Sequence, residues 1–285
     1  MIFISTSCIK AETIRESIIS IAEAGFKNIE LSGGTKYYAG FESDLLLLKN
    51  KYNLNYISHN YFPPPKIPFV INLASSDENI RQKTISHFNR SIKLAKKLDI
   101  SIIGMHAGFF IDPKPSELGK PISLTKISDR NISTNRFVEG FKELSSMSNG
   151  VKLYIENNVL SLVNYDTYKQ NPLMLTSFNE YIELKKQMDF FFMLDVAHLK
   201  VSCNTLGLDF KKEFALFLNE TDYLHLSDNN GLSDSNEYIK QDSSLLNLLK
   251  TSKDQICNKI ITLEIYEDMT KIKKSYELIF DIIKD

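Results

Sequence analysis

Eight short apolar runs alternate with amphipathic stretches from one end of this 285-residue chain to the other. Most runs have apolar residues on both faces, which is typical of parallel strands that helices cover on both sides of the sheet. We predict strands at residues 2–6, 28–32, 54–58, 101–106, 151–156, 190–195, 222–226 and 260–265. We predict helices at residues 11–25, 40–52, 77–98, 134–149, 175–189, 209–219, 242–251 and 269–284. This alternation predicts an α/β fold, a single (β/α)8 TIM barrel.

A doubly wound open sheet is the alternative fold, but no Gly-x-Gly-x-x-Gly motif follows the first predicted strand. No linker rich in proline or glycine divides the chain, so we predict one barrel domain over residues 1–285. Two long loops, 59–76 and 107–133, follow predicted strands. In a barrel both would lie at the face that carries the active site, where long loops form pocket walls.

Composition excludes several classes of partner. The net charge is -1, so no overall field attracts nucleic acid or an anionic membrane. No apolar run approaches the length of a membrane span, and the N-terminal MIFISTSCIK lacks the layout of a signal peptide. The three cysteines are odd in number and widely spaced, which indicates free thiols. We predict a cytoplasmic protein, with self-association into a homo-oligomer left open.

Four acidic or imidazole side chains close hydrophobic runs in the second half of the chain: Glu156, Asp195, His225 and Glu264. The gaps between them are 39, 30 and 39 residues, about the length of one strand-loop-helix-loop unit. Polar residues at the ends of successive barrel strands converge in space. Three carboxylates and one imidazole form a mostly hard ligand shell, for which we favour Mn²⁺, with Mg²⁺, Co²⁺ or Zn²⁺ also suitable. The spacing therefore predicts one divalent-metal site.

Further polar residues end or follow predicted strands. His59, His106 and His198 do so, and we predict that all three bind substrate. Asn158 follows Glu156 by two residues and could bind a substrate hydroxyl. Glu30 lies in the second predicted strand; we predict a contact with substrate, with helix capping or a salt bridge as the alternative.

His87 differs from the other histidines because it lies in the middle of a predicted helix. It stands between Lys83 and Arg90, so we predict an ordinary position on a solvated face.

This residue set suits a particular reaction. A divalent ion can chelate a sugar carbonyl and its neighbouring hydroxyl, and then stabilise the enediolate that forms when a proton leaves the carbon between them. Two glutamates on opposite sides of the substrate could pass that proton as general base and general acid.

The segments IENN, DVAH, HLSDNNG and LEIY resemble the xylose-isomerase-like barrels. That family includes sugar isomerases, ketose 3-epimerases, inosose dehydratases and endonuclease IV enzymes, and the resemblance spans essentially the whole chain. It implies a metal-dependent isomerase or epimerase that acts on a small sugar or sugar phosphate. It also implies that Glu156, Asp195, His225 and Glu264 bind one metal ion and that the two glutamates form the acid/base pair.

The same resemblance assigns roles to the remaining histidines. His198, in the Asp-x-x-His motif, contacts substrate in the family. His59 and His106 match positions that line the sugar pocket in the isomerase-like members and bind further zinc ions in endonuclease IV.

One loop departs from the endonuclease IV pattern, which has an Asp-x-His pair followed by Gly-x-Gly after the seventh strand. Asp234 matches the aspartate, but Asn236 stands in the place of the histidine and the glycines are absent. A neutral amide replaces an imidazole ligand poorly. This argues against a trinuclear zinc site, so a phosphodiesterase ranks below the isomerase. A non-catalytic scaffold and a metal-dependent dehydratase or lyase are further alternatives.

Overall fold

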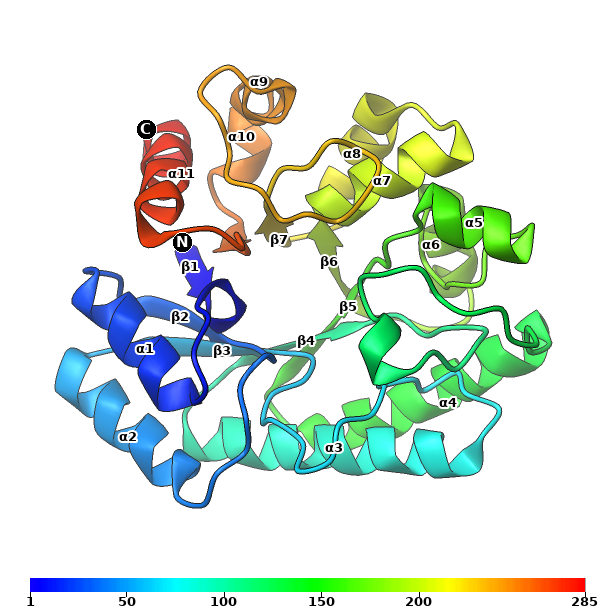
Figure 1. Cartoon of the computed structure of the whole chain (residues 1–285), viewed down its shortest axis with the longest axis horizontal. Helices are drawn as coiled ribbons and strands as arrows, with labels where there is room; N and C mark the ends of the chain where they lie inside the picture. Colours follow the sequence, from blue (N-terminus) through cyan, green and yellow to red (C-terminus); the bar gives the residue numbers. More distant parts are fainter. Residues whose placement is uncertain (285) are drawn as a thin grey trace.

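A computed structural model describes residues 1–284, and it confirms the TIM barrel. Eight parallel strands close into a barrel in the order β1 to β8, and the helices surround it as a ring (Figure 1). The strands are Ile2–Ser5 (β1), Asn28–Leu31 (β2), Asn55–His59 (β3), Ile102–His106 (β4), Lys152–Glu156 (β5), Phe191–Asp195 (β6), Tyr223–Leu226 (β7) and Ile260–Leu263 (β8). Each overlaps one of the predicted runs.

The helices of the described residues form the outer layer. They are Ile14–Glu23 (α1), Phe41–Tyr52 (α2), Glu78–Lys97 (α3), Arg130–Ser148 (α4), Leu162–Tyr168 (α5), Phe178–Lys185 (α6), Val196–Leu206 (α7), Phe210–Leu218 (α8), Ser244–Thr251 (α9), Lys253–Ile256 (α10) and Met269–Ile283 (α11). Short 3-10 helices span Thr6–Cys8 (η1) and Pro115–Glu117 (η2).

Helices α5, α7 and α10 were not predicted, and α4 begins four residues before its predicted start. Helix α7 follows β6 without a loop. Asp195 ends the strand, and its carboxylate also caps the helix by accepting a hydrogen bond from the backbone N–H of His198 at 2.7 Å. Such a cap satisfies an otherwise unpaired N–H of the first helical turn. With no turn residues between strand and helix, the sequence carries no boundary signal here.

The strand register places the candidate site at one end of the barrel. His106 pairs with Glu156 across β4 and β5, and Asp195 pairs with His225 across β6 and β7. The last residues of parallel strands meet at the same edge, so these side chains lie in one layer. The register therefore fulfils the geometric condition for the predicted site.

The barrel interior is packed below that layer. Its apolar cluster draws one residue from each of six strands: Phe3, Ile57, Ile102, Tyr154, Met193 and Tyr223. Gly104 of β4 leaves room within the barrel, because a Cβ atom there would lie 2.7 Å from His59 Cδ2. A separate and larger apolar cluster fills the space between the strands and the surrounding helices. The core thus supports the polar layer from beneath and from outside.

The two long loops leave the C-terminal ends of β3 and β4, at the end of the barrel that carries the candidate site. One side chain joins them. The amide nitrogen of Asn72 donates hydrogen bonds to the carbonyls of Phe109 and Ile111, both at 3.1 Å, and its amide oxygen accepts from the Phe109 N–H at 3.0 Å. The loops are therefore one connected structure, and their role as pocket walls stays a prediction.

The prediction for His87 is wrong. Its side chain is fully buried on α3, and its Nε2 lies 2.9 Å from the carbonyl oxygen of Asn60. Residue Asn60 follows His59 directly and has a positive φ of 40°. The solvated face expected between Lys83 and Arg90 is covered by the loop after β3, and sequence spacing within one helix does not reveal that contact.

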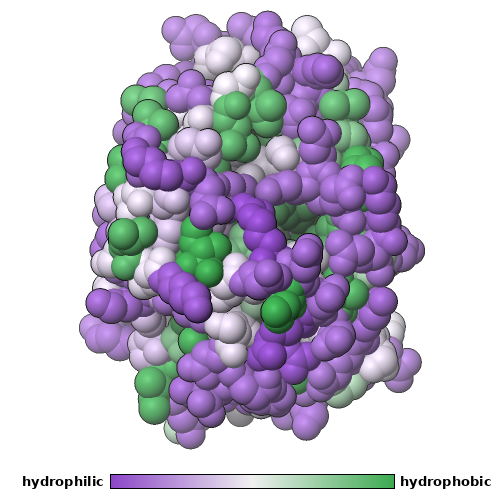
Figure 2. Space-filling view, turned by 90° about the vertical axis from the view of Figure 1, so that its right-hand side faces the viewer, coloured by the Kyte–Doolittle hydropathy of each residue, from purple (hydrophilic) through white to green (hydrophobic). Residues whose placement is uncertain are grey.

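The face of the molecule that Figure 2 shows is mainly polar. The side of the molecule that carries α5 and α6 in Figure 1 has small, separated apolar groups and a hollow near its centre (Figure 2). No helix within residues 1–284 combines the length and the apolar character that a bilayer crossing requires.

Candidate metal centre

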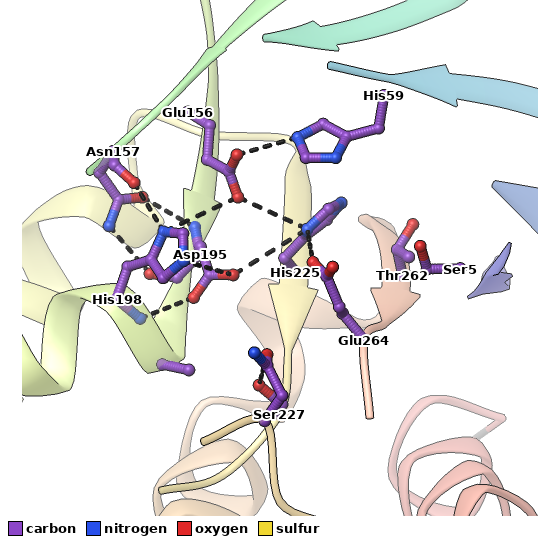
Figure 3. A network of polar contacts seen from close by, with 12 residues as sticks. Ser5, His59, Glu156, Asn157, Asp195, His198, His225, Ser227, Thr262 and Glu264 are labelled. Atoms are coloured by element: carbon purple, nitrogen blue, oxygen red, sulfur yellow. Dashed lines mark hydrogen bonds and ion pairs between the residues drawn. The ribbon is translucent and has the colours of Figure 1, made fainter. Parts of the chain in front are cut away.

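Three of the four predicted metal ligands converge on a ring nitrogen of the fourth, His225. His225 Nδ1 lies 3.2 Å from Glu264 Oε2, 3.5 Å from Glu156 Oε1 and 3.9 Å from Asp195 Oδ2 (Figure 3). Glu156, Asp195 and His225 belong to β5, β6 and β7, and Glu264 follows β8 by one residue. Successive strands thus bring together residues that are far apart in the sequence.

These side chains are taken out of water. Glu156 and His225 have no exposed surface, Asp195 is 1% exposed, and the Glu264 side chain is 13% exposed. Among residues 1–284, the buried Glu156 Oε1 has no hydrogen-bond partner. Burying carboxylates together is costly unless a positive charge pairs with them. The donor set and this unpaired oxygen therefore fit a divalent cation.

The proton equilibria point in the same direction. Burial raises the pKa of the Asp195 carboxyl to about 7, in spite of the neighbouring His198. Burial also acts to raise the pKa of Glu264, but the hydrogen bond and charge of His225 outweigh it and bring that pKa to about 2. Burial lowers the pKa of His225, yet the carboxylates of Glu30 and Glu264 raise it well above its ordinary value. Without a metal, protons on the cluster balance the carboxylates, and a bound cation would displace them.

Two more histidines lie close to the second carboxylate oxygen of Glu156. His59 Nε2 lies 2.9 Å and His106 Nε2 lies 3.2 Å from Glu156 Oε2. These three residues could hold a metal ion of their own, because their ligand atoms lie within 4.8 Å of one another. The His106 side chain is 25% exposed, whereas that of His59 is 4% exposed. Burial lowers the pKa of His106 to about 4, so this imidazole is neutral at pH 7.

His198 is held by one ion pair and one hydrogen bond. Its Nε2 lies 3.2 Å from Asp234 Oδ2, and its Nδ1 lies 2.8 Å from the carbonyl oxygen of Asn157. Asn236 turns its amide oxygen toward Ser227 Oγ at 2.9 Å and its nitrogen toward Asp234 at 3.4 Å. The part of Asn236 that faces Asp234 is thus a hydrogen-bond donor, which is no metal ligand.

Two predicted substrate-binding residues have polar atoms that bind other groups of the protein. Glu30 is fully buried, and its Oε2 lies 2.7 Å from His225 Nε2. The Asn158 amide donates to the carbonyls of Ala107, Gly108 and Met174 at 3.1, 3.0 and 2.9 Å. A substrate contact of either residue stays a prediction.

The sequence analysis missed two hydroxyl groups at Glu264. Ser7 Oγ and Tyr266 OH donate hydrogen bonds to Glu264 Oε1 at 2.9 and 2.8 Å. Oε1 is thereby held by hydroxyl groups, and Oε2 is left to face His225. Tyr266 stands two residues after Glu264, a spacing that brings side chains of extended chain to the same face. That spacing is a signal for Tyr266, whereas nothing in the sequence links Ser7 to this carboxylate.

A model of the family described as "Xylose isomerase-like TIM barrel" matches residues 19–279. The chain belongs to this family. No curated protein sequence matches it. The family assignment agrees with the closed parallel barrel and with the buried cluster of histidine, glutamate and aspartate side chains.

Solved structures of similar fold include both sugar epimerases and an endonuclease. A D-tagatose 3-epimerase-like protein has a TM-score of 0.75 and 19% identity, over 99% of this chain and 97% of that chain. D-psicose 3-epimerase from Clostridium cellulolyticum has a TM-score of 0.67 and 16% identity, over 99% of this chain and 98% of that chain. Endonuclease IV from Thermus thermophilus has a TM-score of 0.63 and 12% identity, over 99% of this chain and 98% of that chain. At these identities the likeness establishes the fold and leaves the reaction to the residues of the site.

Proposed function

We propose that this chain is a divalent-metal-dependent isomerase or epimerase that moves a proton in a sugar or sugar phosphate through an enediolate. The observation that carries the proposal is the position of His225 Nδ1, within 3.9 Å of a carboxylate oxygen from each of Glu156, Asp195 and Glu264. These four residues would hold the ion. We favour Mn²⁺ because three of the four ligands are hard carboxylates.

The two glutamates would move the proton. They approach His225 from different sides (Figure 3), and each contributes one oxygen near Nδ1. A divalent ion bound there would polarise the substrate carbonyl and stabilise the charge that develops on its oxygen. One glutamate takes the proton from the carbon beside the carbonyl, and the other returns a proton from the opposite face, which inverts that carbon. Return to the neighbouring carbon gives the isomer instead.

The histidines would bind and orient the sugar. His106 is partly exposed and neutral, so one of its nitrogens can donate to a substrate hydroxyl and the other can accept. His198 is fixed by Asn157 and Asp234, which keeps its ring at the edge of the site. The loops that Asn72 joins would limit the size of the substrate. The proposed compartment is the cytosol, in keeping with three cysteines that form no disulfide.

Solvent-deuterium incorporation is the direct test. The metal-loaded protein would be incubated in D₂O with a panel of ketoses, aldoses and their phosphates, with Mn²⁺ added. We expect deuterium at the carbon beside the carbonyl of at least one substrate, together with an isomer or epimer. A protein that binds the ion tightly and yet exchanges no proton in any member of the panel would contradict the proposal.

A metal-dependent phosphodiesterase is the second candidate, because His59, His106 and Glu156 form a further group that could hold an ion. Two facts stand against it: Asn236 offers no ligand atom toward Asp234, and the chain has a net charge of -1. Elemental analysis separates the candidates. About one ion per chain supports the isomerase, whereas three zinc ions together with cleavage of duplex DNA would support the phosphodiesterase.

A further inference from the structure

Glu30 occupies a position behind His225, on the side away from the other three carboxylates. Its Oε2 lies 2.7 Å from His225 Nε2, whereas Nδ1 of the same ring faces Glu156, Asp195 and Glu264. Since Nδ1 and Nε2 point in different directions from the imidazole, the ring stands between Glu30 and the candidate metal position. Glu30 is therefore placed to act on the site through His225.

The contacts of Glu30 are concentrated on one oxygen. Oε2 accepts a hydrogen bond from Tyr223 OH and lies 3.4 Å from Thr262 Oγ1, in addition to its bond with His225. Within the described residues Oε1 has no partner, and the side chain has no exposed surface. Two hydroxyl groups thus hold the carboxylate at a fixed place beneath the imidazole ring.

The cost of burying this group indicates what it is for. A carboxylate without access to water is destabilising unless a positive charge lies near it. The groups around Glu30 are the hydroxyls of Tyr223 and Thr262 and the imidazoles of His225 and His59. A protonated His225 ring, or in its place a cation bound at Nδ1, would supply the compensating charge. Carboxylate, histidine and metal in this order form a recurrent arrangement that fixes the ligand ring and strengthens its donor atom.

We infer that Glu30 is a positioning residue that holds the Nε2–H tautomer of His225 and thereby presents the Nδ1 lone pair to a divalent ion. A carboxylate only accepts hydrogen bonds, so Nε2 carries the proton. A neutral imidazole has one proton, which leaves Nδ1 free as a ligand atom. This inference rests on the metal site of the proposed function, and it assigns Glu30 no contact with substrate.

Two variants test it, Glu30→Gln and Glu30→Ala. The glutamine has a carbonyl oxygen that can still accept from Nε2 but has no charge, whereas the alanine has no acceptor. Asp222→Asn is the matched control, because Asp222 also accepts a tyrosine hydroxyl, that of Tyr154 at 3.1 Å, at the opposite end of the barrel. Three quantities would be measured: the dissociation constant of Mn²⁺ or Co²⁺, the ¹⁵N NMR shifts of the His225 ring with Zn²⁺ bound, and the melting temperature of the metal-free protein.

We expect Glu30→Ala to weaken metal binding by about 10–100-fold, the usual effect of removing the partner of a ligand histidine. Glu30→Gln should lie between Glu30→Ala and the unchanged protein. The ring nitrogens of the unchanged protein should report a proton on Nε2 and a metal-bound Nδ1, and Glu30→Ala should lose that pattern. Asp222→Asn should keep both the metal affinity and the His225 pattern.

Unchanged metal affinity and an unchanged tautomer in both Glu30 variants would overturn the inference, even if their melting temperatures fell. None of these measurements uses turnover. If the protein binds metal but converts no sugar, the proposed reaction fails while the inference on Glu30 still stands. If His225→Ala binds metal as tightly as the unchanged protein, the metal site itself fails, and the inference fails with it.

Discussion

The two halves of the barrel supply different kinds of group to the same site. Strands β5–β8 bring the three carboxylates that surround His225 Nδ1, whereas β2–β4 bring Glu30 behind that ring and two imidazoles beside Glu156. The second half thus has the composition of a chelating site, and in our proposal the first half supplies its support and the substrate pocket. Substitutions in the two halves should therefore change different measured quantities, and the following experiments test this division.

Metal removal should have the largest effect. We expect dialysis against a chelator to abolish proton exchange, because carbonyl polarisation would then depend on hydrogen bonds alone. Addition of one equivalent of Mn²⁺ should restore it. Elemental analysis before and after dialysis should show about one ion per chain. A requirement for two or three ions would mean that His59 and His106 also bind metal, and the division between the halves would be lost.

Glu264→Gln and Glu156→Gln should each slow deuterium exchange by roughly 10²–10⁴-fold, the usual worth of a general acid or base. The amide keeps an oxygen that can still contact the ion, so metal content should fall less than the rate. Glu139→Gln, on the exposed surface of α4, is the control for the same chemical change and should alter neither quantity. Full exchange in both site variants with a proven substrate would exclude this pair as the acid and base.

Because His87 is buried, it should make the free energy of unfolding of the protein depend on pH. Burial lowers its pKa to about 4 from an ordinary value of 6.5, so between these values the unfolded chain binds a proton that the folded chain does not. The contribution of His87 to the free energy of unfolding should therefore be at its full value above pH 6.5 and should fall by about 3 kcal/mol as the pH approaches 4. Urea unfolding at several pH values measures this, with His87→Gln as the variant that cannot titrate. Equal slopes in the two proteins would disprove the assignment.

His106→Gln should have the smallest of these effects. If His106 binds substrate and holds no ion, the variant should raise KM by about 10-fold, as expected for the loss of one good hydrogen bond, with kcat and metal content little changed. Steady-state kinetics and elemental analysis on the same samples test this. A loss of bound metal would instead assign His106 to the chelating part of the site.

The sequence predicted best the features that are marked by the residue type at each position, namely the strands and the polar residues at their ends. Every strand could be predicted because a buried parallel strand is apolar on both faces, and one polar residue at or just after the end of each of β5–β8 marked the site. Asp195, His225 and Glu264 are therefore visible from spacing alone. Helix α7 was missed because a ligand residue, in place of a loop, begins it.

Two contacts between distant elements could not be predicted. The place of Glu30 depends on the direction of the His225 ring, which is separated from it by 195 residues. The burial of His87 depends on the path of the loop after β3, to which its Nε2 is bonded. Neither relation has a period or a motif, because each is set by tertiary packing.

The two oxygens of Asp195 have different roles in the molecule. Oδ1 accepts the N–H of His198 and starts α7, whereas Oδ2 faces His225 in the candidate metal centre. A relative that lacks the proposed activity would still need an aspartate, or another capping residue, at this position to begin α7. Among related sequences, Asp195 is accordingly a weak marker of retained activity. Glu156, whose Oε1 has no hydrogen-bond partner within the described residues, is the more informative residue to compare.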